Sequence, residues 1–93
     1  MDVFCNIAEK IIQAQENIIG PVALEQAKKV SGLNVDWVKR DIQITGNKKT
    51  VLESLITQYG HLFGRASIEV CREAVKSLIQ QIPKDQLPPS LAS

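Results

Sequence analysis

The Gly20-Pro21 dipeptide constrains the fold of this chain most, because it ends one amphipathic segment and begins another within two residues. Glycine supplies a flexible joint. Proline lacks a backbone N–H and has a φ angle near helical values, which suits the first turn of a helix. The sequence therefore predicts two packed helices in the first third of the chain, one ending before Gly20 and one starting at Pro21.

The segment from Val3 to Ile19 has the pattern of an amphipathic helix. Its apolar side chains recur three and four positions apart, which places them on one helical face. They are Phe4, Ile7, Ala8, Ile11, Ala14 and Ile18. The second helix is predicted from Pro21 to about Val30, and Gly32 is suited to follow its C-terminus.

The clearest amphipathic pattern lies further along, between Val51 and Phe63, and Gly64 ends it. Two starts are open for this helix, because Asn47 is a good N-cap and Thr50 can begin a capping box. A last helix is predicted over residues 66–82. Leu55 and Leu78 lie at the centres of these two apolar stripes, and we expect both to be buried on facing helices.

Residues 34–47 are ambiguous. Three apolar residues there fit one helical face: Val35, Val38 and Ile42. Residues 42–45, however, alternate between apolar and polar as a short strand does. Because a single strand has nothing to pair with, the interpretation is a short helix over residues 35–42, with a possible short extended segment near 42–45.

These segments predict an all-α fold, a small bundle of four to five helices. The 93 residues suffice for one domain, which we assign to residues 1–83. Pro83 closes the last helix, and residues 84–93 carry too little apolar content to pack firmly, so they are expected to form a mobile tail.

Composition excludes several classes of protein. A net charge of +1 argues against intrinsic disorder and against a dominant polyanionic partner. Acidic Asp2 lies where a secretory signal would carry positive charge, and no run of 18 or more apolar residues is present to span a membrane. The expectation is a cytoplasmic protein without a membrane segment.

No catalytic, metal or cofactor site is predicted. The chain has two cysteines and one histidine, too few for a metal set of these residues. Cys71 falls on an apolar stripe, and both thiols are expected to be reduced and buried. His61 has no nearby carboxylate in sequence to orient it for acid–base catalysis. We therefore expect that the protein is not an enzyme.

Three basic doublets lie in the middle of the chain: Lys28-Lys29, Lys39-Arg40 and Lys48-Lys49. If the fold gathers them, they would form a phosphate-contacting patch. Doublets at helix ends also complement the helix dipole and favour solubility. Because no recognition helix with base-reading side chains stands out, nucleic-acid binding is the secondary hypothesis.

The segment Trp37, Val38, Lys39 and Arg40 is the predicted partner-binding site. Tryptophan is enriched at binding hot spots, and an irregular segment between helices presents side chains that a packed helix buries. The alternative is that Trp37 anchors this segment on the core. In that case the binding face would lie on the polar side of the last helix, around Arg65, Glu69, Arg72 and Lys76.

The stretch Ile19-Gly20-Pro21-Val22-Ala23 resembles a short I-G-P-[IV]-A helical module that is appended to bacterial signalling proteins such as Ser/Thr kinases and cyclases. The resemblance covers about residues 8–30. It implies a regulatory or interaction element without chemistry of its own. The leading hypothesis is therefore a non-enzymatic helical domain that acts through protein contacts, by docking to a partner protein or by forming a homodimer.

Overall fold

The computed structural model describes residues 2–92, and these residues form four α-helices and a two-stranded antiparallel sheet. The helices are α1 (Val3–Ile19), α2 (Val22–Ala27), α3 (Lys48–Phe63) and α4 (Arg65–Ala74). The strands are β1 (Leu33–Asp36) and β2 (Asp41–Ile44). Three short 3-10 helices end the described chain: η1 (Ile79–Gln81), η2 (Lys84–Gln86) and η3 (Pro89–Leu91).

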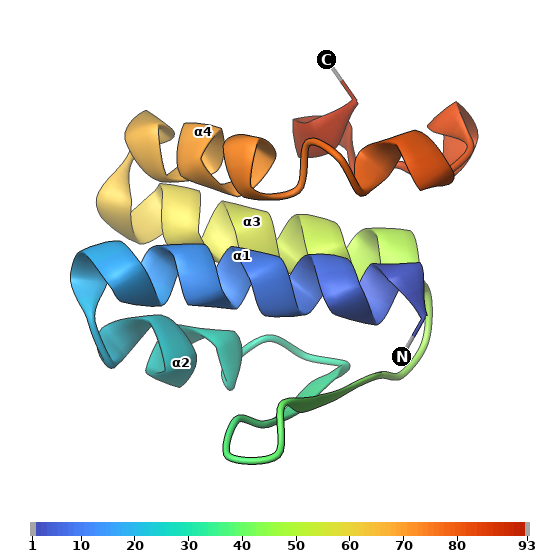
Figure 1. Ribbon diagram of the computed structural model, residues 1–93. Helices are drawn as coiled ribbons and strands as arrows, with labels where there is room; N and C mark the ends of the chain where they lie inside the picture. Colours follow the sequence, from blue (N-terminus) through green and yellow to red (C-terminus); the bar gives the residue numbers. More distant parts are fainter. Residues whose placement is uncertain (1, 93) are drawn as a thin grey trace.

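The elements are arranged in layers (Figure 1). α1 and α3 lie side by side in the middle of the molecule, and α2 and α4 each contact both of them. α4 covers one side of this middle layer together with the C-terminal segment, whereas α2 and the hairpin of β1 and β2 cover the other side (Figure 1). The core consists mainly of aliphatic side chains from α1 and α3, with Tyr59 as its largest member.

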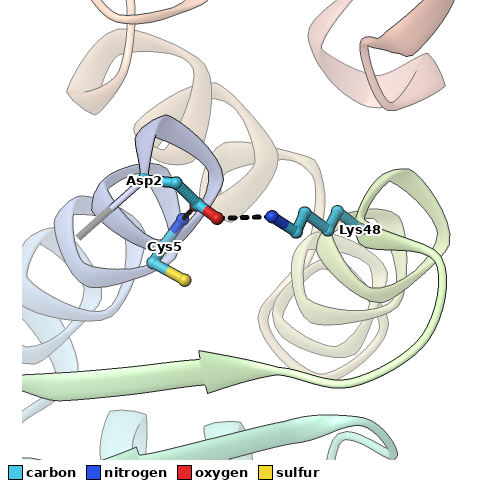
Figure 2. A network of polar contacts seen from close by, with 3 residues as sticks. All are labelled: Asp2, Cys5 and Lys48. Atoms are coloured by element: carbon cyan, nitrogen blue, oxygen red, sulfur yellow. Dashed lines mark hydrogen bonds and ion pairs between the residues drawn. The ribbon is translucent and has the colours of Figure 1, made fainter.

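The first helix begins and ends where the sequence predicts. The Asp2 carboxylate caps α1 by accepting a hydrogen bond from the Cys5 N–H at 2.9 Å, and it also forms an ion pair with Lys48 at the start of α3 (Figure 2). Gly20 ends the helix with a φ of 73°, a left-handed conformation that glycine adopts without strain. These contacts join the N-termini of α1 and α3 at one end of the molecule.

The central helix starts at the earlier of the two predicted caps. The Asn47 side chain accepts a hydrogen bond from the Thr50 N–H at 2.9 Å, so α3 begins at Lys48. Gly64 ends it with a φ of 85°, and α4 follows immediately at Arg65. Two joints, at Gly20 and Gly64, therefore reverse the chain at the same end of the molecule (Figure 1).

The predicted all-α fold is wrong in the segment after α2. The strand at residues 41–44 has a partner, because Leu33–Asp36 pairs with it in antiparallel register, Leu33 opposite Ile44 and Asp36 opposite Asp41. The predicted short helix over residues 35–42 is therefore absent. The spacing of Val35, Val38 and Ile42 fits a helical face. Leu33–Asp36, however, alternates between apolar and polar, which fits a strand with one buried face. Leu33 and Ile42 are buried in the core.

The last predicted helix is shorter than residues 66–82. α4 ends at Ala74, and the chain continues through turns to η1. Val75, which is β-branched, has a lower helix propensity than Ala74, and Ser77 has a lower helix propensity than Lys76. Both residues favour the end of the helix at this point. Leu55 is fully buried, as predicted, but Leu78 lies in this non-helical stretch and is only half-buried.

The expectation that residues 84–93 lack the apolar content to pack is wrong for the part up to Ala92. Leu87, Pro88 and Leu91 are buried, and η3 contacts both α3 and α4. Ser93 lies outside the described residues. The division of the chain into a domain and a mobile tail stays a prediction, for which hydrogen exchange is the relevant measurement.

Candidate interaction surfaces

The predicted partner-binding segment forms the turn between β1 and β2. The Arg40 N–H donates to the Trp37 carbonyl at 3.2 Å, and Arg40 closes the turn with a φ of 55°. The Arg40 guanidinium carbon lies 3.7 Å from the centroid of a Trp37 ring, and its Nη1 donates to Gln13 Oε1 on α1 at 2.7 Å. These contacts attach the turn to α1.

The four residues of this turn differ in exposure. Trp37 is half-buried and packs against the core, whereas Val38 is 96% exposed. Lys39 is exposed, and its N–H donates to the Asp36 carboxylate at 3.2 Å. The structure therefore gives Trp37 the anchoring contacts of the alternative interpretation, while Val38 and Lys39 remain free to meet another molecule.

A second surface lies at the end of the molecule that carries the two glycine joints. Four large apolar side chains are exposed there, and together they are called the apolar end: Ile18, Val22, Leu62 and Phe63. Three of them continue a buried stripe beyond the core. Ile18 follows Gln15 by one helical turn on α1, and Leu62 and Phe63 follow Tyr59 by one turn on α3. The apolar faces of both long helices are therefore uncovered at this end.

Two buried hydrogen bonds hold the joints together. The Tyr59 hydroxyl on α3 donates to the Ala23 carbonyl on α2 at 2.6 Å. Gln15 Nε2 on α1 donates to the Ser67 carbonyl on α4 at 2.9 Å. One bond lies just after the Gly20 joint and the other just after the Gly64 joint, so α2 is fixed to α3 and α4 is fixed to α1 at this end.

Two charged side chains flank the apolar end. Glu25 is exposed in the first turn of α2, and Arg65 is exposed as the first residue of α4. α2 and α4 pack on opposite sides of the α1–α3 layer, so Glu25 and Arg65 belong to opposite sides of this end (Figure 1). The α2 side also carries exposed Lys28 and Lys29, so it does not have a single sign of charge.

Both thiols are free, and both are buried, as the sequence predicts. Desolvation raises the pKa of Cys71 to about 11, although the Gln15 amide, 3.3 Å from its sulfur, opposes the shift. Desolvation and the nearby Asp2 carboxylate raise the pKa of Cys5 (Figure 2). Neither environment favours a thiolate near neutral pH. His61 is exposed, and residues 2–92 contain no cluster of three metal-ligating side chains.

The basic doublets lie on three different elements and differ in their contacts. Lys48 is paired with Asp2, and Lys49 Nζ donates to the Asp85 carbonyl at 3.0 Å. Arg40 is held by Trp37 and Gln13. Lys28 and Lys29 are exposed after the end of α2. Three of the six basic side chains therefore make contacts within the protein: Arg40, Lys48 and Lys49.

The polar side of α4 borders a shallow groove of about 290 Å³ against η1 and η3. Its charged residues alternate in sign, Glu69, Arg72, Glu73 and Lys76, and Arg72 pairs with Glu69 at 3.3 Å. Such a mixture provides no single-sign field for a charged ligand.

The apolar end is not predicted as a surface from the sequence, because Ile18, Leu62 and Phe63 belong to the apolar stripes of two amphipathic helices, and such stripes predict burial. The sequence feature that indicates this surface is the length of those stripes, which run up to the helix-ending glycines.

Comparisons with models of known protein families, with characterised proteins and with solved structures find no match. Within residues 2–92, every helix is too short or too polar to cross a membrane.

Proposed function

We propose that this chain is a helical protein-interaction domain that docks through the apolar end. The observation that carries the proposal is the exposure of four large apolar side chains at one end of the molecule, three of which continue the apolar stripes of α1 and α3. Contiguous exposed apolar surface on a small protein is typical of interaction sites, whereas single exposed apolar residues are ordinary.

A non-enzymatic role is part of this proposal. The two nucleophilic thiols are buried with raised pKa values, which suits structural cysteines rather than catalytic ones. The I-G-P-[IV]-A resemblance of residues 8–30 suggests in addition a regulatory role. The motif at residues 19–23 contributes Val22 to the apolar end, so it overlaps the proposed surface at this residue.

The hairpin turn is proposed as a second, smaller contact region for the partner. Of the predicted site Trp37, Val38, Lys39 and Arg40, the two outward residues Val38 and Lys39 are those we assign to partner contact. Nucleic-acid binding through the basic doublets is not favoured, because Arg40, Lys48 and Lys49 already make contacts inside the protein.

Site-specific photo-crosslinking tests the proposal. A photoreactive phenylalanine analogue replaces Phe63 in one variant and Gln80, which is exposed in η1, in a matched control, and crosslinks are formed in living cells. We expect a discrete adduct from position 63 that Ile18→Glu abolishes. An absence of adducts from position 63, or an identical adduct pattern in the Ile18→Glu background, would contradict docking through the apolar end.

A further inference from the structure

We propose that a furrow between α3 and α4 is a peptide-docking groove, which the C-terminal segment of the chain fills as an internal ligand. This segment, residues 83–92, is called the strap. The partner that the groove fits is a peptide segment with the chemistry of the strap, in which two leucines flank a Pro-Pro-Ser sequence. The furrow is separate from the apolar end, and this inference does not depend on the proposed function.

The strap lies between two hollows that remain beside it. The hollow of about 290 Å³ next to α4 has Leu91 of the strap in its wall. A second hollow of about 400 Å³ lies next to α3, with Pro89 of the strap and Glu53 of α3 in its wall. Figure 1 shows the strap on the same side of the α1–α3 layer as α4. The furrow is therefore wider than the strap that it holds.

Side chains hold the strap in the furrow. Within residues 2–92, the backbone hydrogen bonds of the strap join only its own residues, such as the Leu91 N–H and the Pro88 carbonyl at 2.9 Å. From α3, Glu53 accepts two hydrogen bonds from Ser90, and Lys49 Nζ donates to the Asp85 carbonyl. Because no helix or strand pairing crosses this contact, the strap can open at the end of the chain while α1–α4 stay folded.

The conformation of the strap indicates what the groove recognises. Leu87 has φ and ψ of −79° and 136°, and Pro88 has −56° and 143°, so both adopt the polyproline II conformation. Proline fixes φ in advance, which lowers the entropy lost when such a segment docks. Leu87, Pro88 and Leu91 are the buried anchors. The Glu53 carboxylate completes the site by accepting from the Ser90 N–H and hydroxyl.

The strap makes the groove autoinhibited. A ligand that is part of the same chain has a high effective concentration at its site, so a free peptide of the same sequence competes poorly with it. A partner segment therefore binds after the strap opens, and the stability of the strap sets the affinity that the partner observes.

A fluorescent synthetic peptide of residues 83–92 tests the inference by fluorescence anisotropy with the full chain. Leu91→Asp opens the furrow, because it places a carboxylate at a buried apolar position of the strap. Ser90→Pro is a second open variant, which removes both groups that donate to Glu53. We expect saturable binding of the peptide to the open variants, about tenfold or more tighter than to the unchanged chain.

Two matched changes in the open variants locate the bound peptide. Glu53→Ala should weaken binding by about tenfold or more, whereas Glu25→Ala, on α2, should leave it unchanged. Binding that Glu53→Ala does not weaken, or equal binding to the unchanged chain, overturns the inference. So does the absence of binding to a folded open variant. Circular dichroism checks the fold, and loss of the fold in both open variants would show that the strap does not leave the furrow, which also overturns it.

Discussion

Glu53 on α3 holds Ser90 of η3 through both of its carboxylate oxygens. Oε1 accepts from the Ser90 N–H at 2.9 Å, and Oε2 accepts from the Ser90 hydroxyl at 2.7 Å. A carboxylate that accepts two hydrogen bonds from one residue fixes the position and the orientation of that residue. This contact, together with buried Leu87 and Leu91, packs the C-terminal segment against the helices.

Replacement of Glu53 by alanine should loosen the C-terminal segment without unfolding the protein. Hydrogen bonds to charged groups contribute about 1.5–3 kcal/mol, so amide exchange over residues 87–92 should accelerate by about tenfold or more. Glu25→Ala, on α2 at the other side of the α1–α3 layer, is a matched control and should leave this exchange unchanged. Full exchange of these amides within the dead time in the unchanged chain would instead support the mobile tail that the sequence predicts.

Leu55 and Leu78 should differ in their contribution to stability. Leu55 is fully buried, and Leu55→Ala should lower the free energy of unfolding by about 2–5 kcal/mol through lost burial and a cavity. Leu78 is half-buried, so Leu78→Ala should cost roughly half as much on the same transfer scale. Urea unfolding of the two variants measures both values. Equal losses would show that the segment after α4 is buried more deeply than the structure has it.

The ion pair between Asp2 and Lys48 should make stability depend on acidic pH. Hydrogen bonding from Lys48, and then from the Cys5 N–H, lowers the pKa of Asp2 to about 2. Because the folded-state pKa lies below the ordinary value of 3.8, this contribution is present above about pH 4 and is lost as the pH falls toward 2.

Asp2→Asn retains a side-chain oxygen for the cap but removes the charge. The difference in unfolding free energy between this variant and the unchanged chain should therefore be larger at pH 7 than at pH 2. A difference that is independent of pH would show that the ion pair with Lys48 does not contribute.

The double change Trp37→Ala with Arg40→Ala should destabilise the hairpin. It removes a half-buried aromatic ring, a cation–π contact and the bond to Gln13, and we expect a loss of about 1–3 kcal/mol. Far-UV circular dichroism at low temperature should stay helical. If stability were unchanged while partner binding weakened, Trp37 would be the interface anchor that the sequence predicts.

The helices were predictable because their signals are local. The N-cap at Asn47, the glycines at positions 20 and 64, and the three-and-four spacing all lie within one element. The hairpin was not predicted, since strand pairing is a relation between two segments and the strand at Leu33–Asp36 is only four residues long. The apolar end was not predicted from the sequence for a related reason. Ile18 and Phe63 continue buried stripes, and only the packing of four helices determines where cover ends.

Photo-crosslinking in living cells from a photoreactive analogue at position 62, with Phe63 either unchanged or replaced by serine, tests the central claim most directly. Phe63 is partly exposed at the end of α3, so its replacement should leave the fold intact while it removes apolar contact area from the proposed interface. We expect a discrete crosslinked adduct when Phe63 is present and a decrease of about tenfold or more in its yield with Phe63→Ser. An adduct of equal yield from the two proteins, with both folded, would contradict docking through the apolar end.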